Sequence, residues 1–228
     1  MEFIRQILSG FDLDKLVIIL IALLACIVCI TVHELCHGLA AWALGDCTAK
    51  RTGRLSLNPL AHIDPIGFLM LLIARVGWAK PVPVDVRSFR HPKRYMALTA
   101  LAGPVSNFLV AFLCVCSASV IYPFADGVAW AYVLYFLCYT CVLSVGLGLF
   151  NLIPIPPLDG SKLLFSVFPD KLYFACLRYE RYLMLLVVAL AWFGFFSGPL
   201  SAAIGWVISG FCRVIGFPFD FFTYCFAM

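Results

Sequence analysis

Charged side chains are scarce in this sequence. Only 12% of the 228 residues are Asp, Glu, Lys or Arg, whereas 64% are hydrophobic and the mean hydropathy is +1.02. A soluble domain carries about 25% charged residues, and one core cannot hide this much apolar surface from water. The composition therefore excludes a soluble globular protein and predicts an integral membrane protein. The formal net charge of +4 is small, and the basic residues cluster beside apolar runs, which indicates membrane topology and no nucleic-acid partner.

Several other features are missing. The sequence has no glycine-rich phosphate loop, no internal repeat and no low-complexity linker, and its polar loops are too short for a separate folded domain. Because the charged first fifteen residues lead to no small-residue cleavage site, the first apolar run is expected to be retained and not cleaved as a signal peptide. We therefore expect one membrane domain over residues 1–228. The eleven cysteines lie mostly in apolar runs without zinc-finger spacing, which favours packing over disulfides or metal binding.

The first apolar run carries a metal-binding pattern. Residues 16–32 have no charge and lead directly into His33, Glu34 and His37 of an H-E-x-x-H motif. Positions i and i+4 share one face of a helix, so both imidazoles can bind one Zn²⁺, while the glutamate points about 100° away and suits a base acting on a zinc-bound water. Ionisable side chains in lipid are costly unless they face protein or water. The motif therefore predicts a zinc site in preference to an exposed helix face.

A catalytic zinc needs a third protein ligand. The apolar run 128–150 ends in residues 151–160, NLIPIPPLDG, where three prolines stop the helix and hold Asp159 on irregular backbone at the membrane side where the first run ends. Asp159 is the first candidate for the third ligand and Asp64 the second, with a helix cap as the alternative role of Asp159. His62 is expected either to orient a ligand or to cap its own loop.

The apolar runs predict an all-α polytopic membrane protein with about five transmembrane helices, or four in the alternative. Residues 66–74 are too short to cross, and residues 77–84, GWAKPVPV, must be extended because of their alternate prolines. Together they predict a re-entrant or extended element, which either pairs with an incoming peptide or forms an interfacial loop. The expected spans are 16–45, 95–122, 128–150 and two short helices in 182–212, separated at Ser197-Gly198-Pro199.

Five motifs in this order resemble the site-2 protease family of intramembrane zinc metalloproteases, especially its short bacterial and archaeal members. They cover about residues 16–165, and C-terminal helices within 182–216 follow. The motifs are HELCHG at 33–38, NPLAHIDPIG at 58–67, GWAKPVPV at 77–84, AGPVSN at 102–107 and NLIPIPPLDG at 151–160.

The resemblance implies roles for individual residues. His33, His37 and Asp159 would bind one Zn²⁺ per chain, Glu34 would be the general base, and Asn151 would hold the substrate backbone or the oxyanion. Two further candidates for substrate or oxyanion binding are Asn58 and Asn107, although Asn107 also suits a hydrogen bond between helices.

The family cleaves transmembrane helices of other proteins, so the resemblance implies a membrane-helix substrate and a lipid bilayer as partners. The expected location is a prokaryotic cytoplasmic membrane, with the site toward the cytoplasm because the basic loops lie there. No PDZ insert or cystathionine-β-synthase-type domain is expected, which leaves substrate choice and regulation open, and the oligomeric state is open too. The alternatives are a pseudoprotease that binds helices without cutting and a zinc transporter. Against a transporter, residues 95–122 and 128–150 hold no acidic residue or histidine that would continue a path.

Overall fold

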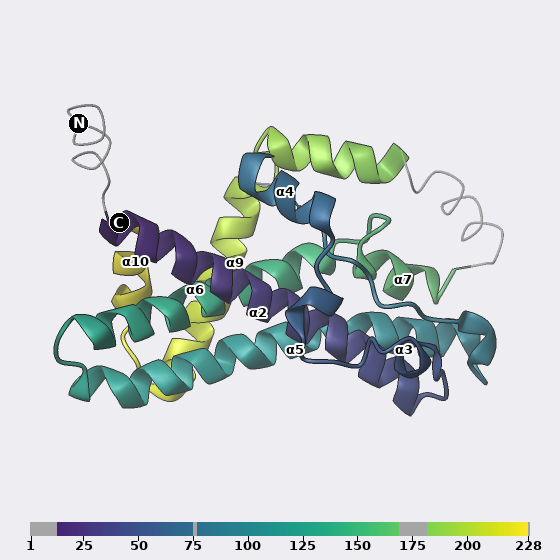
Figure 1. Ribbon diagram of the computed structural model, residues 1–228, viewed down its shortest axis with the longest axis horizontal. Coiled ribbons are helices and arrows are strands. Elements are labelled where there is room, and N and C mark those ends of the chain that lie inside the picture. Colours follow the sequence, from purple (N-terminus) through teal and green to yellow (C-terminus); the bar gives the residue numbers. More distant parts are fainter. Residues whose placement is uncertain (1–12, 75–76, 169–181, 228) are drawn as a thin grey trace, which may run out of the picture.

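The computed structural model describes residues 13–74, 77–168 and 182–227, and their regular structure is helical (Figure 1). Four of these helices are long and apolar enough to cross a membrane. No strand occurs in the part of the chain that is described, which confirms the predicted all-α polytopic fold. The four helices are α2 (Leu13–Ala43), α5 (Pro92–Ile121), α6 (Val128–Asn151) and α9 (Ser197–Ile215).

Long helices form here because a helix satisfies its backbone N–H and C=O groups by hydrogen bonds within the segment. Lipid offers no hydrogen-bond partners for these groups. α2 has 31 residues. At 1.5 Å per residue this is about 46 Å, longer than the hydrocarbon core of about 30 Å. The helix stops where predicted, because the chain leaves it through Gly45, whose φ of +108° lies in the left-handed region that favours glycine.

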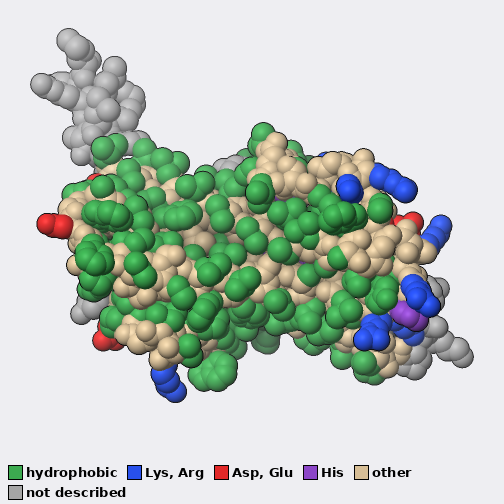
Figure 2. Space-filling model, turned by 90° about the horizontal axis from the view of Figure 1, so that it is seen from below, with side chains coloured by type: hydrophobic (Ala, Val, Ile, Leu, Met, Phe, Trp, Pro, Cys, Tyr) green, Lys and Arg blue, Asp and Glu red, His purple; other side chains and the backbone are tan. Residues whose placement is uncertain are grey.

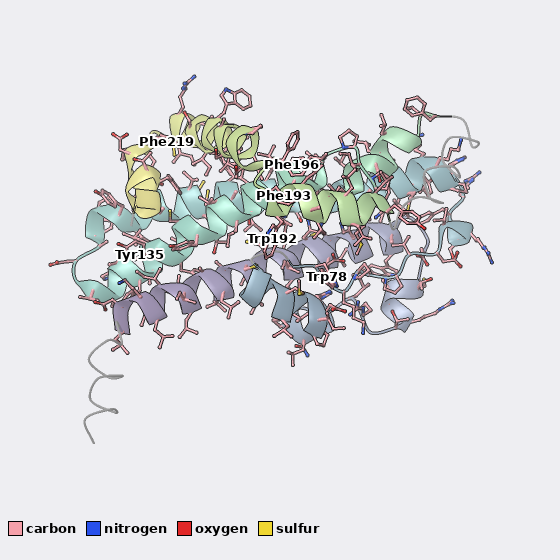
Figure 3. All side chains as sticks on the ribbon, turned by 90° about the horizontal axis from the view of Figure 1, so that it is seen from above. Trp78, Tyr135, Trp192, Phe193, Phe196 and Phe219 are labelled. Carbon is pink, nitrogen blue, oxygen red and sulfur yellow. The ribbon has the colours of Figure 1, made fainter. Side chains whose placement is uncertain are left out.

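The C-terminal apolar stretch differs from the expectation. Its first part is the helix Tyr182–Trp192, which is shorter than the roughly 20 residues needed to cross. The described residues therefore match the alternative of four spans. Ser197-Gly198-Pro199 does not separate the helices but begins α9, because a proline in the first turn needs no backbone partner. The turn lies just before and contains Phe196 (Figure 3). The rings of Phe196 and Phe150 are 5.8 Å apart.

Between α2 and α5 the chain forms short helices and an extended segment. Residues 77–85 have no helix, and Ala79 forms an isolated antiparallel bridge with Ile63. The N–H of Lys80 donates to the carbonyl of His62 at 2.9 Å. A short apolar helix followed by extended backbone is the element that the prolines predicted. The helices of this region are α3 (Thr48–Arg51), η1 (Pro59–Ala61), α4 (Pro65–Ala74) and η2 (Val86–Ser88).

α5 packs along both α2 and α6, and α2 also contacts α6. The apolar core joins α5, α6 and α9 near η3 (Tyr122–Phe124) and α10 (Asp220–Ala227), with Val115, Val145 and Phe222 among its buried members. At the other end of the bundle α7 (Asp159–Phe165) lies on α5. The core therefore fixes the helices, and the polar residues gather at the opposite end.

The surface agrees with a membrane environment. Leu24, Leu109 and Trp206 are 53%, 58% and 80% exposed. Figure 2 shows hydrophobic side chains over the middle of the molecule, whereas most Lys and Arg side chains in view lie at the end that holds α3 and the start of α5.

Candidate metal centre and active site

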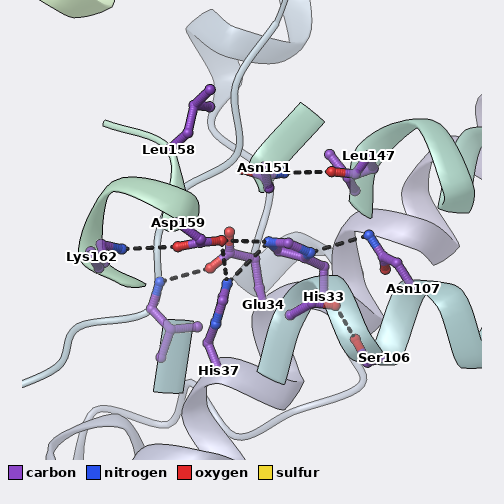
Figure 4. Close-up of polar contacts among 12 residues, drawn as sticks. His33, Glu34, His37, Ser106, Asn107, Leu147, Asn151, Leu158, Asp159 and Lys162 are labelled. Carbon is purple, nitrogen blue, oxygen red and sulfur yellow. Dashed lines mark hydrogen bonds and ion pairs between the residues drawn. The ribbon is translucent and has the colours of Figure 1, made fainter. Parts of the chain in front are cut away.

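Three potential metal ligands meet at the polar end of the bundle (Figure 4). Nε2 of His33 and Nε2 of His37 are 3.0 Å apart, and Oδ2 of Asp159 lies 3.2 Å and 2.9 Å from them. All three residues are buried. Within the described residues, no other group of three or more His, Cys, Asp or Glu side chains could hold a metal ion.

The backbone after α6 brings Asp159 to this point. The helix ends at Asn151, irregular backbone follows, and α7 begins at Asp159 itself. Leu158 is the N-cap, with no side-chain cap hydrogen bond, so the capping alternative for Asp159 is wrong. The second candidate ligand, Asp64, does cap a helix: its Oδ1 accepts the N–H of Gly67 at 2.8 Å, at the start of α4.

The hydrogen bonds of the imidazoles suit a metal. Nδ1 of His37 lies 2.7 Å from the carbonyl oxygen of Thr99. A carbonyl only accepts, so Nδ1 carries the proton and Nε2 presents its lone pair. Nδ1 of His33 lies 3.1 Å from the Asn107 amide, whose buried Oδ1 has no partner among the described residues. A half-turn of this amide brings Oδ1 to Nδ1–H, which satisfies both groups and frees Nε2 of His33 as well.

The distances suit zinc. With zinc–ligand bonds of about 2.0–2.1 Å, tetrahedral geometry sets ligand atoms about 3.3 Å apart. The three observed separations, 2.9, 3.0 and 3.2 Å, are close to this value. Two imidazoles and one carboxylate, with room for a fourth ligand, form the donor set of a catalytic zinc site.

Asp159 is held as a carboxylate. Burial disfavours its charged form, but hydrogen bonds with His33 and His37 and the positive charge of Lys162 hold its pKa well below the usual range. Nζ of Lys162 lies 3.0 Å from Oδ1 of Asp159. The lysine therefore occupies one oxygen and leaves Oδ2 to face the two imidazoles.

Glu34 lies beside the three ligands but takes no part in their triangle. Its Oε2 accepts the backbone N–H of Val82 at 3.0 Å. The carboxylate and the three ligands line one cavity of about 440 Å³, together with Asn151 and Lys162. A water in this cavity can therefore reach both the ligand triangle and the glutamate.

A second cavity of about 440 Å³ adjoins the first. It is lined mainly by apolar side chains of α2, α6 and α9, such as Ile27, Leu143 and Ile204. The two cavities share Ile30 and Trp78, among other residues, so they are neighbours, and the second lies on the apolar flank of the bundle.

Two predicted asparagines form hydrogen bonds within the protein. Asn107 is 0% exposed and lies behind His33, where it forms the hydrogen bond between helices that was the alternative role. Asn58 is exposed, and its Oδ1 accepts the N–H of Leu60 at the start of η1. It does not line the site cavity of the described structure.

His62 and Asn151 remain near the site. Nε2 of His62 is 2.8 Å from the carbonyl of Ser56, six residues earlier, so this contact holds its own loop. Asn151 lines the site cavity, but its Nδ2 donates to the carbonyl of Leu147 within α6 at 3.0 Å.

Sequence reasoning missed the residues that hold the extended segment. Asp46 is fully buried, and its Oδ2 accepts the N–H of Asp85 at 2.7 Å. Nη2 of Arg54 donates to the carbonyls of Lys80 and Pro81 at 3.0 and 2.9 Å. The only signal in the sequence was a charged residue directly after the glycine that ends α2.

Comparisons with known proteins point to zinc metalloproteases. A family model described as "Peptidase family M50" matches residues 117–193, which include Asp159 but not the two histidines. "Putative zinc metalloprotease YwhC" of Bacillus subtilis is 36% identical over 183 residues, which are 79% of this chain and 81% of that protein.

Longer relatives match over a smaller share. "Putative zinc metalloprotease Rip2" of Mycolicibacterium smegmatis is 32% identical over 132 residues, 56% of this chain and 49% of the relative. Rip2 of Mycobacterium tuberculosis H37Rv is 31% identical over 138 residues, 59% and 52% of the two chains. The matched region thus spans about half the length of the Rip2 proteins. No solved structure matches.

Proposed function

The chain belongs to peptidase family M50 and is an integral membrane zinc metalloprotease, and from this premise we propose that it hydrolyses peptide bonds within transmembrane segments of other membrane proteins. The observation that supports the substrate class is the apolar cavity beside the site. It is lined by α2, α6 and α9 and shares residues with the cavity that holds the three ligands and Glu34. Apolar side chains of a membrane segment match such walls, whereas a polar soluble peptide does not.

His33, His37 and Asp159 would hold the Zn²⁺. When bound, the ion polarises the scissile carbonyl and lowers the pKa of a water ligand toward about 7. Glu34 takes the proton of the attacking water and delivers it to the leaving amine nitrogen. The water oxygen forms the new bond to the carbonyl carbon, the C–N bond breaks, and the two products are a carboxylic acid and an amine, which become a carboxylate and an ammonium group by proton exchange.

The remaining side chains of the cavity position the substrate. Asn151 lines it, and its amide binds the substrate backbone or the oxyanion once it leaves the carbonyl of Leu147. A substrate helix must unwind locally, because its carbonyls are otherwise occupied by hydrogen bonds. The site lies at the end of the bundle where Lys and Arg gather, so by the positive-inside rule it opens toward the cytoplasm (Figure 2).

The test uses purified protein in detergent and a reporter with one apolar transmembrane segment, weakened by a central Gly-Pro pair, between two soluble tags. We expect wild type to cut the reporter within this segment, and Glu34→Gln to hold about one zinc per chain but lose at least about 100-fold in kcat. Asp126→Asn, an exposed carboxylate far from the site, is the matched control and should cut normally.

Three outcomes would contradict the proposal. Retained cleavage by Glu34→Gln would remove the glutamate from the mechanism. Binding of the reporter without any cleavage by the zinc-loaded wild type would favour the pseudoprotease. Zinc uptake into vesicles that hold the protein would favour the transporter, although the described ligand set lies at one end of the bundle only.

A further inference from the structure

We propose that the backbone N–H of Val82 positions the Glu34 carboxylate for proton transfer, and that Pro81 and Pro83, which have no N–H, leave Val82 as the one backbone donor among residues 81–83. The inference rests on the proposed role of Glu34. Val82 belongs to the extended segment between α4 and η2, and its N–H donates to Oε2 of Glu34 at 3.0 Å. In the described part of the chain this is the one hydrogen bond that Glu34 accepts.

The two prolines make the donor unique at this place. Proline has no backbone N–H and fixes φ near about −65°, and it also biases the preceding residue toward extended backbone. Of residues 81–83, only Val82 can therefore donate, and Pro83 biases its backbone toward the extended conformation. The N–H of Lys80, the next donor along the segment, already bonds to the carbonyl of His62.

Side chains anchor the segment on both sides of Val82. Arg54 donates to the carbonyls of Lys80 and Pro81, and Asp46 accepts the N–H of Asp85. Hydrogen bonds with one charged partner are roughly twice as strong as neutral ones. The Val82 N–H is thus fixed relative to α2, from which Asp46 follows directly and which carries Glu34.

The Val82 side chain adds a packing contact one helical turn further along α2. A Cβ on Gly38 would lie 2.6 Å from Cδ2 of Leu55 and 3.2 Å from Cγ1 of Val82, so the missing side chain of the glycine leaves room for both side chains. Glu34 and Gly38 are four residues apart and lie on one face of α2. Both the backbone N–H and the side chain of Val82 contact this face of α2. His33 and His37 lie on the neighbouring face, which points to the ligand triangle.

The hydrogen bond from Val82 sets the orientation of the Glu34 carboxylate. Oε2 is engaged by the N–H, which restricts rotation of the carboxylate and leaves Oε1 for the water. Proton transfer needs heavy atoms about 2.6–3.2 Å apart, so a carboxylate that turns freely reacts more slowly. Val82 is therefore a positioning residue that acts through Glu34.

The experiment compares Val82→Pro with Val82→Ala on the tagged single-span reporter. The proline variant keeps the extended backbone but has no N–H, whereas the alanine variant keeps the N–H and loses most of the side chain. We expect kcat of Val82→Pro to fall about 10- to 100-fold below that of Val82→Ala, with similar KM and similar zinc content. Should Val82→Pro not accumulate as folded protein, an ester at this position, made with the α-hydroxy acid of valine, removes the N–H and keeps the side chain.

Each outcome separates the inference from the function on which it rests. Equal kcat in the two variants, or a loss of zinc or a rise in KM confined to the variant without the N–H, would overturn the positioning role. Glu34→Gln, measured in parallel, reports on the function itself. If Glu34→Gln is inactive and the two Val82 variants are equal, only the inference fails; if Glu34→Gln cuts like wild type, the role of Glu34 fails first.

Discussion

Gly103→Ala is expected to remove zinc from the protein without unfolding it. Gly103 lies on α5 opposite the two histidines of α2. A Cβ at this position would lie 2.4 Å from Nε2 of His37, 2.5 Å from its Cε1 and 2.7 Å from Cε1 of His33. Non-bonded heavy atoms prefer separations of about 3.5–4.0 Å, so the imidazoles or α5 must move by about 1 Å.

That displacement is large on the scale of a metal site. Zinc–ligand distances in functional sites stay within about 0.2 Å of the ideal values. Mutating residues that hydrogen-bond to metal ligands lowers metal affinity about 10- to 100-fold. Displacing both imidazoles should therefore lower zinc affinity at least about 100-fold. The helix itself gains, because alanine favours helix over glycine by about 0.8–1.0 kcal/mol. Loss of zinc should therefore not be accompanied by loss of α5.

The assay is zinc per chain after equilibration against a series of chelator concentrations in detergent, with thermal unfolding measured on the same samples. Gly146→Ala on α6 is the matched control, because its Cβ would meet only Cδ1 of Ile204, at 3.3 Å, the end of a flexible side chain. Wild-type zinc affinity in Gly103→Ala would refute the placement of α5 against the ligand triangle.

Three further predictions follow from the same structure. Asn107→Leu leaves Nδ1 of His33 unpaired and should weaken zinc binding about 10- to 100-fold in the chelator assay, while Asn107→Asp keeps an acceptor and should recover most of it; equal affinities would refute the contact. Burial raises the pKa of Asp46, but hydrogen bonds from Thr48 and the N–H of Asp85 outweigh this and lower it. Because the pKa of Asp46 is lower in the folded than in the unfolded protein, where it is about 3.9, the carboxylate stabilises the fold at pH values above about 4, and this stabilisation declines as the pH falls further. The Tm of Asp46→Asn should therefore lie furthest below that of wild type at pH 7, and the difference should shrink below about pH 4. Chelation should abolish reporter cleavage and lower Tm, because zinc at 100 times its Kd contributes about 2.7 kcal/mol to the folded state; an unchanged Tm would contradict a site formed only on folding.

The long helices could be predicted from local pattern. Uncharged runs bounded by turns gave spans at 16–45, 95–122 and 128–150, and the structure has α2, α5 and α6 within a few residues of these limits. The pairing of His33 and His37 followed from helix geometry alone, because a spacing of four residues needs no tertiary information. The third metal ligand was harder to predict. The prolines that end the helix after residue 151 were the signal that pointed to Asp159.

The partners of polar side chains could not be predicted in this way. His62 bonds to the carbonyl of Ser56, and Asn58 caps a short 3₁₀ helix, although both lie in a motif that resembles the family. The bond between Asp46 and Asp85 joins residues 39 positions apart. Such pairs depend on how the loop folds back on α2, and neither hydrophobic period nor residue type specifies that path.

A simple register does connect two of the motifs once the helices are placed. On α5, Thr99, Gly103 and Asn107 recur every four residues and share one face, and this face lies against His37 and His33. The backbone carbonyl of Thr99 accepts the hydrogen bond of His37, the glycine leaves room for both rings, and the asparagine bonds to His33. A shift of one residue in α5 would bring Ala102 or Pro104 opposite the rings in place of the glycine and would remove Asn107 from His33. The spacing of small and polar residues on α5 is therefore matched to the spacing of the ligands on α2, and the two motifs form one packing unit in which neither helix can slide along the other without losing the site.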